Sequence, residues 1–321
     1  MADPNAVICL GEALIDRLGP LGGDPARDQP VDDRLGGAPA NVACGLARLG
    51  TAVSFVGRVG GDAIGADFQH LFSQRGVDTS TLQLDPSRPT RIVLVRRSRD
   101  GERQFQGFAG DQGDGFADQV LQPVALPSAA QWLLVGTIPL SSPQSAQALF
   151  DAVAQARSQS IPLALDVNWR PTFWDVAADP SAGPTQAARS VIRPLLEQAA
   201  LIKLAREEAL WFFAGDDPGV ISSGLPQRPD VVVTDGAAPV RWCIGGESGT
   251  QLAMSPPEVV DTTGAGDAFT AGLLHRWSAP VPQRLRFAAA CGALVCSGTG
   301  GIDPQPTEDQ VDAFLNAPNR R

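Results

Sequence analysis

Short, continuous apolar segments recur along the chain and predict buried β-strands. The first, at residues 6–12, reads Ala-Val-Ile-Cys-Leu-Gly-Glu and ends in a glycine and an acid. An apolar run of this length is typical of a strand that is covered on both faces, as in a parallel sheet. Similar segments occur at residues 52–56, 132–135, 162–166, 201–204 and 231–235.

Between most of these segments, apolar residues recur at helical spacing. Positions three or four apart are apolar in three sets, which are Val42, Leu46 and Leu49, then Ile64, Phe68 and Leu71, and finally Phe269, Leu273 and Leu274. Strands that alternate with helices predict a largely parallel sheet with helices on both faces. We therefore expect one α/β domain over residues 1–321, with its site at the carboxyl ends of the strands.

Two stretches interrupt this alternation. Residues 19–35 are rich in Gly, Pro and Asp, and residues 91–106 hold two β-prone segments around Asp100-Gly101. An Asp-Gly pair between β-prone segments is a strong signal for a hairpin. Because this hairpin is richer in Arg and Gln than the other predicted strands, we place it outside the main sheet. We expect a small β lid formed by about residues 17–35 and 90–110.

The balance of charges narrows the classes of partner. Lys and Arg number 25 against 35 for Asp and Glu, which gives a net charge of -10. This charge disfavours non-specific binding to nucleic acid or to an anionic membrane surface, although a few arginines or a helix N-terminus can still hold an anionic substrate. The chain starts without a basic segment and has no apolar run near the ~20 residues that cross a bilayer, so we expect a soluble cytoplasmic protein. Five cysteines without a recognised spacing predict buried thiols rather than a disulfide framework.

One segment has the elements of phosphoryl-transfer chemistry. Residues 261–269 read Asp-Thr-Thr-Gly-Ala-Gly-Asp-Ala-Phe and open the apolar helix that runs through Leu273. Glycines at a helix entry let the backbone approach a ligand, and the unpaired N–H groups of the first turn favour a phosphate. Beside such an anion hole, Asp267 could take the proton of a substrate hydroxyl, or it could only cap the helix. These residues alone leave both interpretations open.

Other nucleotide-binding patterns are missing from the sequence. It has no GxxxxGK[ST] loop and no HRD or DFG element, which excludes a P-loop kinase and a protein kinase. The glycine cluster at residues 57–61 has the wrong spacing for GxGxxG, which argues against an NAD-dependent dehydrogenase.

Residues 261–267 are similar to the C-terminal signature of the PfkB, or ribokinase-like, sugar kinases. Residues 36–43 and 57–62 resemble the N-terminal signature of the same family, and the two matches lie more than half the chain apart. The segment Asp166-Val-Asn168-Trp-Arg170, followed by Trp174, and residues 287–293 look most like those of fructokinases. Because the DxNxR stretch is shared with ketodeoxygluconate kinases, 2-keto-3-deoxygluconate is the nearest alternative acceptor, ahead of ribose or a nucleoside.

The resemblance implies a fold, an activity and its cofactors. The expected fold is a three-layer α/β/α domain of the ribokinase type, with a mostly parallel central sheet and a small β lid. The expected activity is transfer of the γ-phosphate of ATP to D-fructose, with Mg²⁺ and a K⁺ site as cofactors. Sugar and ATP would be the partners, with a homodimer formed through the lid. From another class, the alternative is a non-catalytic protein with a kinase fold.

The resemblance also implies roles for individual residues. Asp267 would be the general base, beside an anion hole formed by Gly264, Ala265 and Gly266. The expected sugar contacts are Asp16, Gly36, Gly37 and Asn41. Arg170 would contact the transferring phosphate or the sugar, and the expected nucleotide contacts are Asn168, Lys203, Thr234 and Gly236. Without the resemblance, Asp16 could be a solvated loop acid, the glycine pair a turn before a helix, and Arg170 a surface salt-bridge residue.

Metal contacts are the least complete part of the pattern. Lys203, the only lysine of the chain, opens a stretch like the family's Lys-x-Asn-x-x-Glu, in which Glu208 would orient Mg²⁺ through water. Ala205 replaces the usual asparagine of this stretch, which weakens the Mg²⁺ assignment. Asp261 and Thr263, together with residues 297–302, resemble the region that binds a monovalent cation in many relatives.

Overall fold

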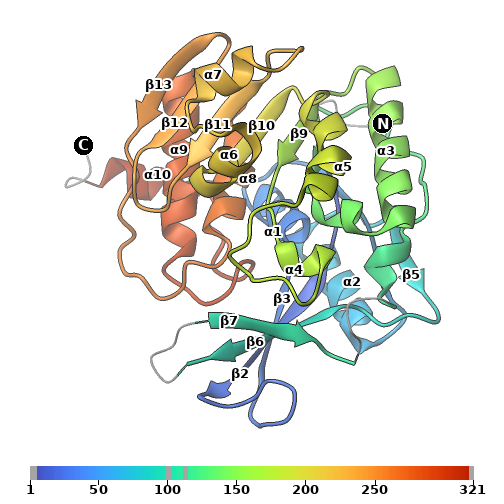
Figure 1. The fold of residues 1–321 in the computed structure, drawn as a ribbon. Helices are drawn as coiled ribbons and strands as arrows, with labels where there is room; N and C mark the ends of the chain where they lie inside the picture. Colours follow the sequence, from blue (N-terminus) through green and yellow to red (C-terminus); the bar gives the residue numbers. More distant parts are fainter. Residues whose placement is uncertain (1–5, 99–102, 111–114, 318–321) are drawn as a thin grey trace.

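The central sheet of the computed structural model, which describes residues 6–98, 103–110 and 115–317, is mostly parallel (Figure 1). Within these residues it has nine strands, in the spatial order β13 (Glu247–Gln251), β12 (Val240–Ile244), β11 (Asp230–Thr234), β10 (Leu201–Ala205), β9 (Leu163–Asp166), β8 (Trp132–Val135), β1 (Val7–Leu10), β4 (Val53–Gly60) and β5 (Leu82–Asp85). Neighbours from β5 to β11 are all parallel, whereas β12 and β13 pair antiparallel at one edge. The predicted parallel sheet is confirmed.

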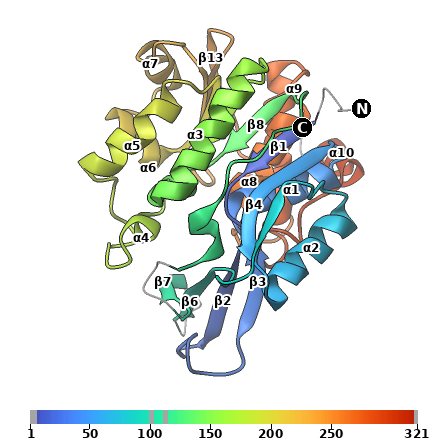
Figure 2. The same cartoon turned by 90° about the vertical axis from the view of Figure 1, so that its right-hand side faces the viewer.

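Helices cover both faces of this sheet because its buried strands are apolar on both sides (Figure 2). On β1, Val7 and Cys9 belong to one core cluster, and Ile8 and Leu10 belong to the other. The first face is covered by α1 (Ala38–Arg48), α2 (Ala63–Arg75), α8 (Ala265–His275), α9 (Val281–Val295) and α10 (Glu308–Asn316). The second is covered by α3 (Pro143–Ser158), α5 (Gln186–Leu196), α6 (Arg206–Phe213) and α7 (Pro218–Ser223). Three short helical segments are η1 (Ala117–Val120), η2 (Ile138–Ser141) and α4 (Pro171–Trp174).

The apolar pattern missed the two edge strands β5 and β13, and also β12, which lies between β13 and β11. The residues of β13 read Glu-Ser-Gly-Thr-Gln, and their side chains are exposed or half-buried. An edge strand forms by pairing with its neighbour and needs no apolar run of its own. The three predicted helical stripes lie on α1, α2 and α8, with Leu49 just past the end of α1.

A second sheet projects beyond the carboxyl ends of the central strands (Figure 1). In the described residues it has four strands, in the order β3 (Asp32–Gly36), β2 (Leu14–Leu21), β6 (Ile92–Arg97) and β7 (Arg103–Phe108). It covers the stretches that we expected to form a lid, but it begins at Leu14, earlier than residue 17, because β2 follows closely on β1. Asp16 therefore lies on a strand, so the interpretation of Asp16 as a loop residue was wrong. The Asp100-Gly101 turn falls outside the described residues.

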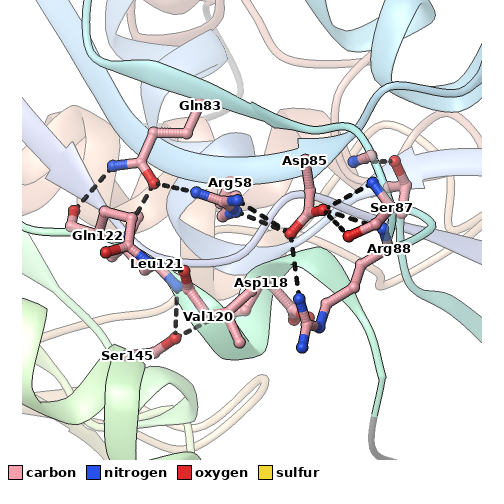
Figure 3. Close-up of polar contacts among 12 residues, drawn as sticks. Arg58, Gln83, Asp85, Ser87, Arg88, Asp118, Val120, Leu121, Gln122 and Ser145 are labelled. Atoms are coloured by element: carbon pink, nitrogen blue, oxygen red, sulfur yellow. Dashed lines mark hydrogen bonds and ion pairs between the residues drawn. The ribbon is translucent and has the colours of Figure 1, made fainter.

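A polar network fixes the edge of the central sheet near the base of this second sheet (Figure 3). Arg58 of β4 pairs with Asp85 at 3.0 Å and donates to Gln83 Oε1 at 3.1 Å. Burial opposes ionisation of Asp85, but backbone N–H groups of Ser87 and Arg88 hold its pKa well below the usual range. The Gln83 amide in turn donates to the Gln122 carbonyl at 2.7 Å. Arg58, in the segment that resembles the N-terminal signature, thus has a structural role.

Arg91, next to the start of β6, joins the second sheet to the rest of the molecule. Its side chain is 2% exposed and pairs with Asp118 at 2.8 Å. The guanidinium lies over three aromatic rings, at 4.7 Å from Phe108 of β7, 4.6 Å from Phe116 and 5.0 Å from Phe173 of α4. Cation–π contacts of this kind are strongest when water is excluded.

In the part of the chain that is described, no helix is long and apolar enough to cross a membrane.

Candidate active site

A cavity of about 480 Å³ lies between the second sheet and the carboxyl ends of the central strands. Its apolar wall on the second sheet includes Val93, Val95 and Phe105. Twelve of the sixteen predicted site residues line it, and these are Asp16, Gly37, Asn41, Asn168, Arg170, Lys203, Glu208, Thr263, Gly264, Ala265, Gly266 and Asp267. The fold thus brings residues from positions 16 to 267 into one cavity.

Four predicted site residues do not line this cavity. Gly36 lies directly behind Asp16, since a Cβ at Gly36 would come within 3.0 Å of Asp16 Oδ2. Thr234 ends β11 beside Ala205, and its hydroxyl donates to the Leu204 carbonyl at 3.3 Å. Gly236 follows on the surface. Asp261 is buried behind the cavity wall.

Asp267 lies in the first turn of α8, where a glycine begins the helix. Gly264 has φ 78°, and a Cβ there would come within 2.5 Å of Gly301 Cα, so glycine is required at this position. The Asp267 carboxylate accepts a hydrogen bond of 2.7 Å from the Asn41 amide of α1. Burial, and then the charge of Asp166, raise the pKa of Asp267 to about 6. The hydrogen bond from Asn41 favours a role for Asp267 beyond capping of α8.

A buried ion pair lies directly beneath this turn. The Nζ atom of Lys203 on β10 is 3.1 Å from both carboxylate oxygens of Asp166, the last residue of β9. Burial disfavours charge on Lys203, but the carboxylates of Asp166 and Glu208 raise its pKa above the usual value. The Thr270 hydroxyl of α8 lies 2.9 Å from Asp166 Oδ2 and 2.9 Å from the Gly266 carbonyl oxygen. Asp166 and Thr270 were not predicted as site residues, although Asp166 belongs to the DxNxR segment.

Glu208 is held by backbone groups on two sides. One of its oxygens accepts the Trp169 N–H and the other accepts the Ala205 N–H, each at 2.7 Å. Burial raises the pKa of Glu208, and the charge of Lys203 opposes this rise. The Ala205 contact caps α6, which begins without a side-chain cap from Ala205 itself. Glu208 therefore fastens the segment around Asn168 and Arg170 to the start of α6.

Arg170 and Asn168 lie in the turn between β9 and α4. Asn168 has φ 41°, a left-handed conformation that asparagine tolerates better than most residues. Arg170 is exposed at the cavity rim, and its Nη1 atom donates to the Trp169 carbonyl at 3.0 Å. Both residues line the cavity.

On the opposite side of the cavity, Glu12 is a residue that the sequence analysis missed. Its side chain is 2% exposed and accepts the Ala38 N–H at 3.1 Å, at the start of α1. Its other oxygen is buried and has no hydrogen-bond partner among the described residues. Burial raises the pKa of Glu12 to about 8. The sequence signal for Glu12 was an acidic residue just beyond the end of a buried strand, because functional sites commonly lie at the carboxyl ends of parallel strands.

Gly37 makes the turn that brings α1 to the cavity. Its φ is 101°, and a Cβ would lie 2.5 Å from the Glu12 carbonyl oxygen. Only glycine fits both conditions. The turn sets the direction of α1 and thereby places Asn41 against Asp267.

The loop that precedes α8 and the loop at residues 297–302 are joined through Asp261. Its Oδ1 atom accepts both the N–H and the hydroxyl of Thr263, at 3.0 and 2.7 Å, and its Oδ2 atom accepts the Gly300 N–H at 2.8 Å. In the described ranges, no group of three or more His, Cys, Asp or Glu side chains is arranged to hold a metal ion.

Known proteins resemble this chain in both sequence and fold. Residues 5–308 match the model of the pfkB family of carbohydrate kinases. A fructokinase of Klebsiella pneumoniae is 35% identical over 95% of this chain and 98% of its own. The crystal structure of a Vibrio cholerae O395 fructokinase double mutant, in a form that contains fructose, ADP and a potassium ion, superposes with a TM-score of 0.81 at 27% identity, over 98% of this chain and 99% of its own. A Xylella fastidiosa fructokinase with bound ATP gives a TM-score of 0.80 at 27% identity, over 97% and 98% of the two chains.

The resemblance seen in the sequence is therefore confirmed, as is the three-layer ribokinase-like fold. The chain is a phosphotransferase that acts on a carbohydrate, with a fructokinase-like sequence and structure. It belongs to the PfkB family of carbohydrate kinases.

Proposed function

We propose that the protein transfers the γ-phosphoryl group of ATP to the 6-hydroxyl of D-fructose and yields fructose 6-phosphate. The observation that carries this proposal is the position of Asp267, between an uncapped helix N-terminus and the polar groups of Asp16 and Asn41 in one cavity. The fructose and ADP in the Vibrio cholerae fructokinase structure support the choice of substrates.

Asp267 acts as the general base in this proposal. A base must be ionised to accept a proton, and it works best when its pKa lies near the operating pH. With a pKa of about 6, Asp267 is mostly ionised at neutral pH but more basic than an ordinary aspartate. The hydrogen bond from Asn41 holds the carboxylate toward the sugar side of the cavity.

The first turn of α8 forms the anion hole. Because its N-cap is Gly264, no side chain of the N-cap residue occupies the N–H groups of this turn. The N–H groups of Gly264 and Gly266 and the positive end of the helix dipole then stabilise charge on the transferring phosphoryl group, while the Ala265 N–H donates to the Thr262 carbonyl at 3.2 Å and shapes the turn. The exposed guanidinium of Arg170 adds a second source of positive charge at the rim.

Sugar and nucleotide occupy opposite ends of the cavity. Asp16, Gly37 and Asn41 contact the sugar from β2 and the start of α1, with Gly36 of β3 directly behind Asp16. The nucleotide contacts are Asn168 and Lys203 inside the cavity, together with Thr234 and Gly236 at the end of β11, outside it. Parallel sheets commonly bind nucleotides at this edge.

The residues on the nucleotide side fit a Mg²⁺ ion that arrives with the phosphates. Protein sites for Mg²⁺ commonly use one or two carboxylates together with substrate phosphates rather than a full protein cage. Glu208 would hold the ion through water, and the ion would neutralise charge on the β- and γ-phosphates. A monovalent cation site at Asp261, Thr263 and residues 297–302 fits the oxygen atoms available there, and the potassium ion in the Vibrio cholerae structure supports it.

The second sheet acts as a lid in this proposal. Closure of β2, β3, β6 and β7 over the sugar would exclude water, which competes as a phosphoryl acceptor. We also propose that two copies pair through this lid, which light scattering during size-exclusion chromatography tests through the mass in solution.

The experiment that tests the function is ADP release from ATP and Mg²⁺ with fructose, 2-keto-3-deoxygluconate, ribose and adenosine in parallel. Turnover with fructose in preference to the other three supports the proposal. Preference for another acceptor refutes the assignment of fructose but keeps a sugar kinase. The absence of turnover with all four, at intact folding, would contradict the proposed activity.

A further inference from the structure

Three buried polar side chains connect the central sheet to the helix that carries Asp267. Asp166 is 5% exposed, Lys203 is 9% exposed and Thr270 is 2% exposed. They come from β9, β10 and α8, so the network joins two strand ends to one helix. A buried polar network in which each member has a partner fixes the relative positions of its elements.

The network reaches the anion-hole segment at two points. The Thr270 hydroxyl lies 2.9 Å from the Gly266 carbonyl oxygen, one helical turn earlier, and 2.9 Å from Asp166 Oδ2. A Cβ at Gly266 would come within 3.0 Å of Lys203 Nζ. The ammonium group of Lys203 therefore lies directly against the turn that contains Gly266 and Asp267.

We propose that Asp166, Lys203 and Thr270 are positioning residues, which hold the first turn of α8 so that Asp267 meets the substrate hydroxyl and which balance the charge around it. This inference rests on the proposed function, because it takes Asp267 to be the general base. Asp166 acts through Lys203 and Thr270, and the single hydroxyl proton of Thr270 is shared between the Asp166 carboxylate and the Gly266 carbonyl. Lys203 has a second use, because it also lines the cavity.

Charge in this network acts on Asp267 in two opposite ways. The carboxylate of Asp166 raises the pKa of Asp267, and the ammonium of Lys203 and the guanidinium of Arg170 lower it. Two further buried carboxylates face this region: Glu208 acts on Lys203, and Glu12, on the opposite side of the cavity, interacts with the charge of Asp267. Loss of the negative charge of Asp166 therefore makes Asp267 a weaker base that ionises at lower pH.

The first test compares two substitutions of Thr270. Thr270→Val keeps the shape of the side chain but removes the hydroxyl, whereas Thr270→Ser keeps the hydroxyl. We expect kcat with fructose to fall about 10- to 100-fold in Thr270→Val, as for a misplaced catalytic group, with little change in KM, and to recover in Thr270→Ser. Thr81→Val is the matched control, since the Thr81 hydroxyl donates to the Phe55 carbonyl outside the cavity. Equal kcat in Thr270→Val and wild type would overturn the role of Thr270.

The second test measures the pH dependence of kcat/KM in Asp166→Asn. We expect the acid limb to move to lower pH, because the variant lacks the charge that raises the pKa of Asp267. A purely structural role would lower the rate or the melting temperature without moving this limb. An unmoved acid limb in a folded variant would overturn the proposal. If Asp166→Asn does not fold, the comparison of Thr270→Val with Thr270→Ser still tests the proposal.

A third readout does not depend on activity. Because Lys203 is the only lysine, labelling with ¹⁵N-lysine gives one Nζ signal in an NMR spectrum. We expect this signal to shift in Asp166→Asn and in Thr270→Val but not in Thr81→Val. An unchanged signal in the first two variants would refute the network itself. If the signal shifts while Asp267→Ala still turns over fructose, the network stands and the proposed role of Asp267 fails.

Discussion

Replacement of Asp267 by Asn separates what this carboxyl costs the fold from what it contributes to catalysis. The pKa of Asp267 is raised from the ordinary 3.8 to about 6, by burial first and then by the charge of Asp166. Between these two pH values the folded protein binds more protons at this site than the unfolded chain does. The free energy of unfolding therefore falls as pH rises through this window and is constant on either side of it.

The magnitude follows from the size of the shift. At about 1.4 kcal/mol per pKa unit, the ionised carboxyl costs the folded state at most about 3 kcal/mol above pH 6. Asparagine is never charged and so lacks this cost, and the bond from Asn41 is already contained in the net shift. We expect Asp267→Asn to be more stable than wild type by at most about 3 kcal/mol at pH 8, or about 4 °C in melting temperature for a chain of this length, and to show little difference near pH 4.

Two assays on the same preparations test this reasoning. Urea unfolding at pH 4 and pH 8 measures the stability difference, and ADP release with fructose measures a loss in kcat of about 10²–10⁴. Asp151→Asn, on the exposed face of α3, is the control and should change neither quantity. A variant that is less stable than wild type at pH 8 would refute the burial cost, and a variant with more than a tenth of wild-type activity would refute the role as base.

Three further substitutions test how the cavity is built. Gly37→Ala should lower the free energy of unfolding by more than about 1 kcal/mol in urea titration, because φ is 101° and the Cβ would lie 2.5 Å from the Glu12 carbonyl oxygen; equal stability would contradict this. Burial raises the pKa of Glu12 to about 8, so the stability of wild type should fall as pH rises from about 4.5 to about 8. Glu12→Gln should remove that fall, and an unchanged pH profile of urea unfolding would count against it. Arg91→Leu leaves Asp118 buried without its partner and should cost about 3–5 kcal/mol, part of which Arg91→Leu/Asp118→Leu should restore in thermal unfolding.

The strands that could be predicted from the sequence are those that are buried on both faces. Every residue of β1, β8 and β9 is buried, and each of these strands reads as an apolar run, which in β9 ends at Asp166. The polar strand β13 gives no such signal, since it exists only through its pairing with β12. The second sheet was anticipated from its hairpin, but its start was not, because β2 follows β1 almost without a break.

The site was predictable where the backbone itself demands a residue type. Gly37 and Gly264 have positive φ values and close neighbours, so they are visible in the sequence as glycines of two motifs. Contacts between distant residues could not be predicted in this way. Asn41 and Asp267 are 226 positions apart, and only the folded chain brings the amide of one to the carboxylate of the other.

Residues missed by the sequence analysis act through burial and charge rather than through a motif. Thr270 is one of many polar residues in apolar helices, and nothing in its spacing indicates a contact with Asp166. Arg91 looks like an ordinary strand residue until three aromatic rings and Asp118 enclose it. The importance of such residues depends on desolvation, which only the folded structure defines.

The measurement that tests the account most directly is ³¹P NMR of wild type and Asp267→Ala, each incubated with ATP, Mg²⁺ and fructose. The account predicts equal amounts of ADP and fructose 6-phosphate with wild type, and neither product above background with the variant. Phosphate on another hydroxyl, free phosphate without a sugar phosphate, or the same product at a similar rate from the variant would contradict it.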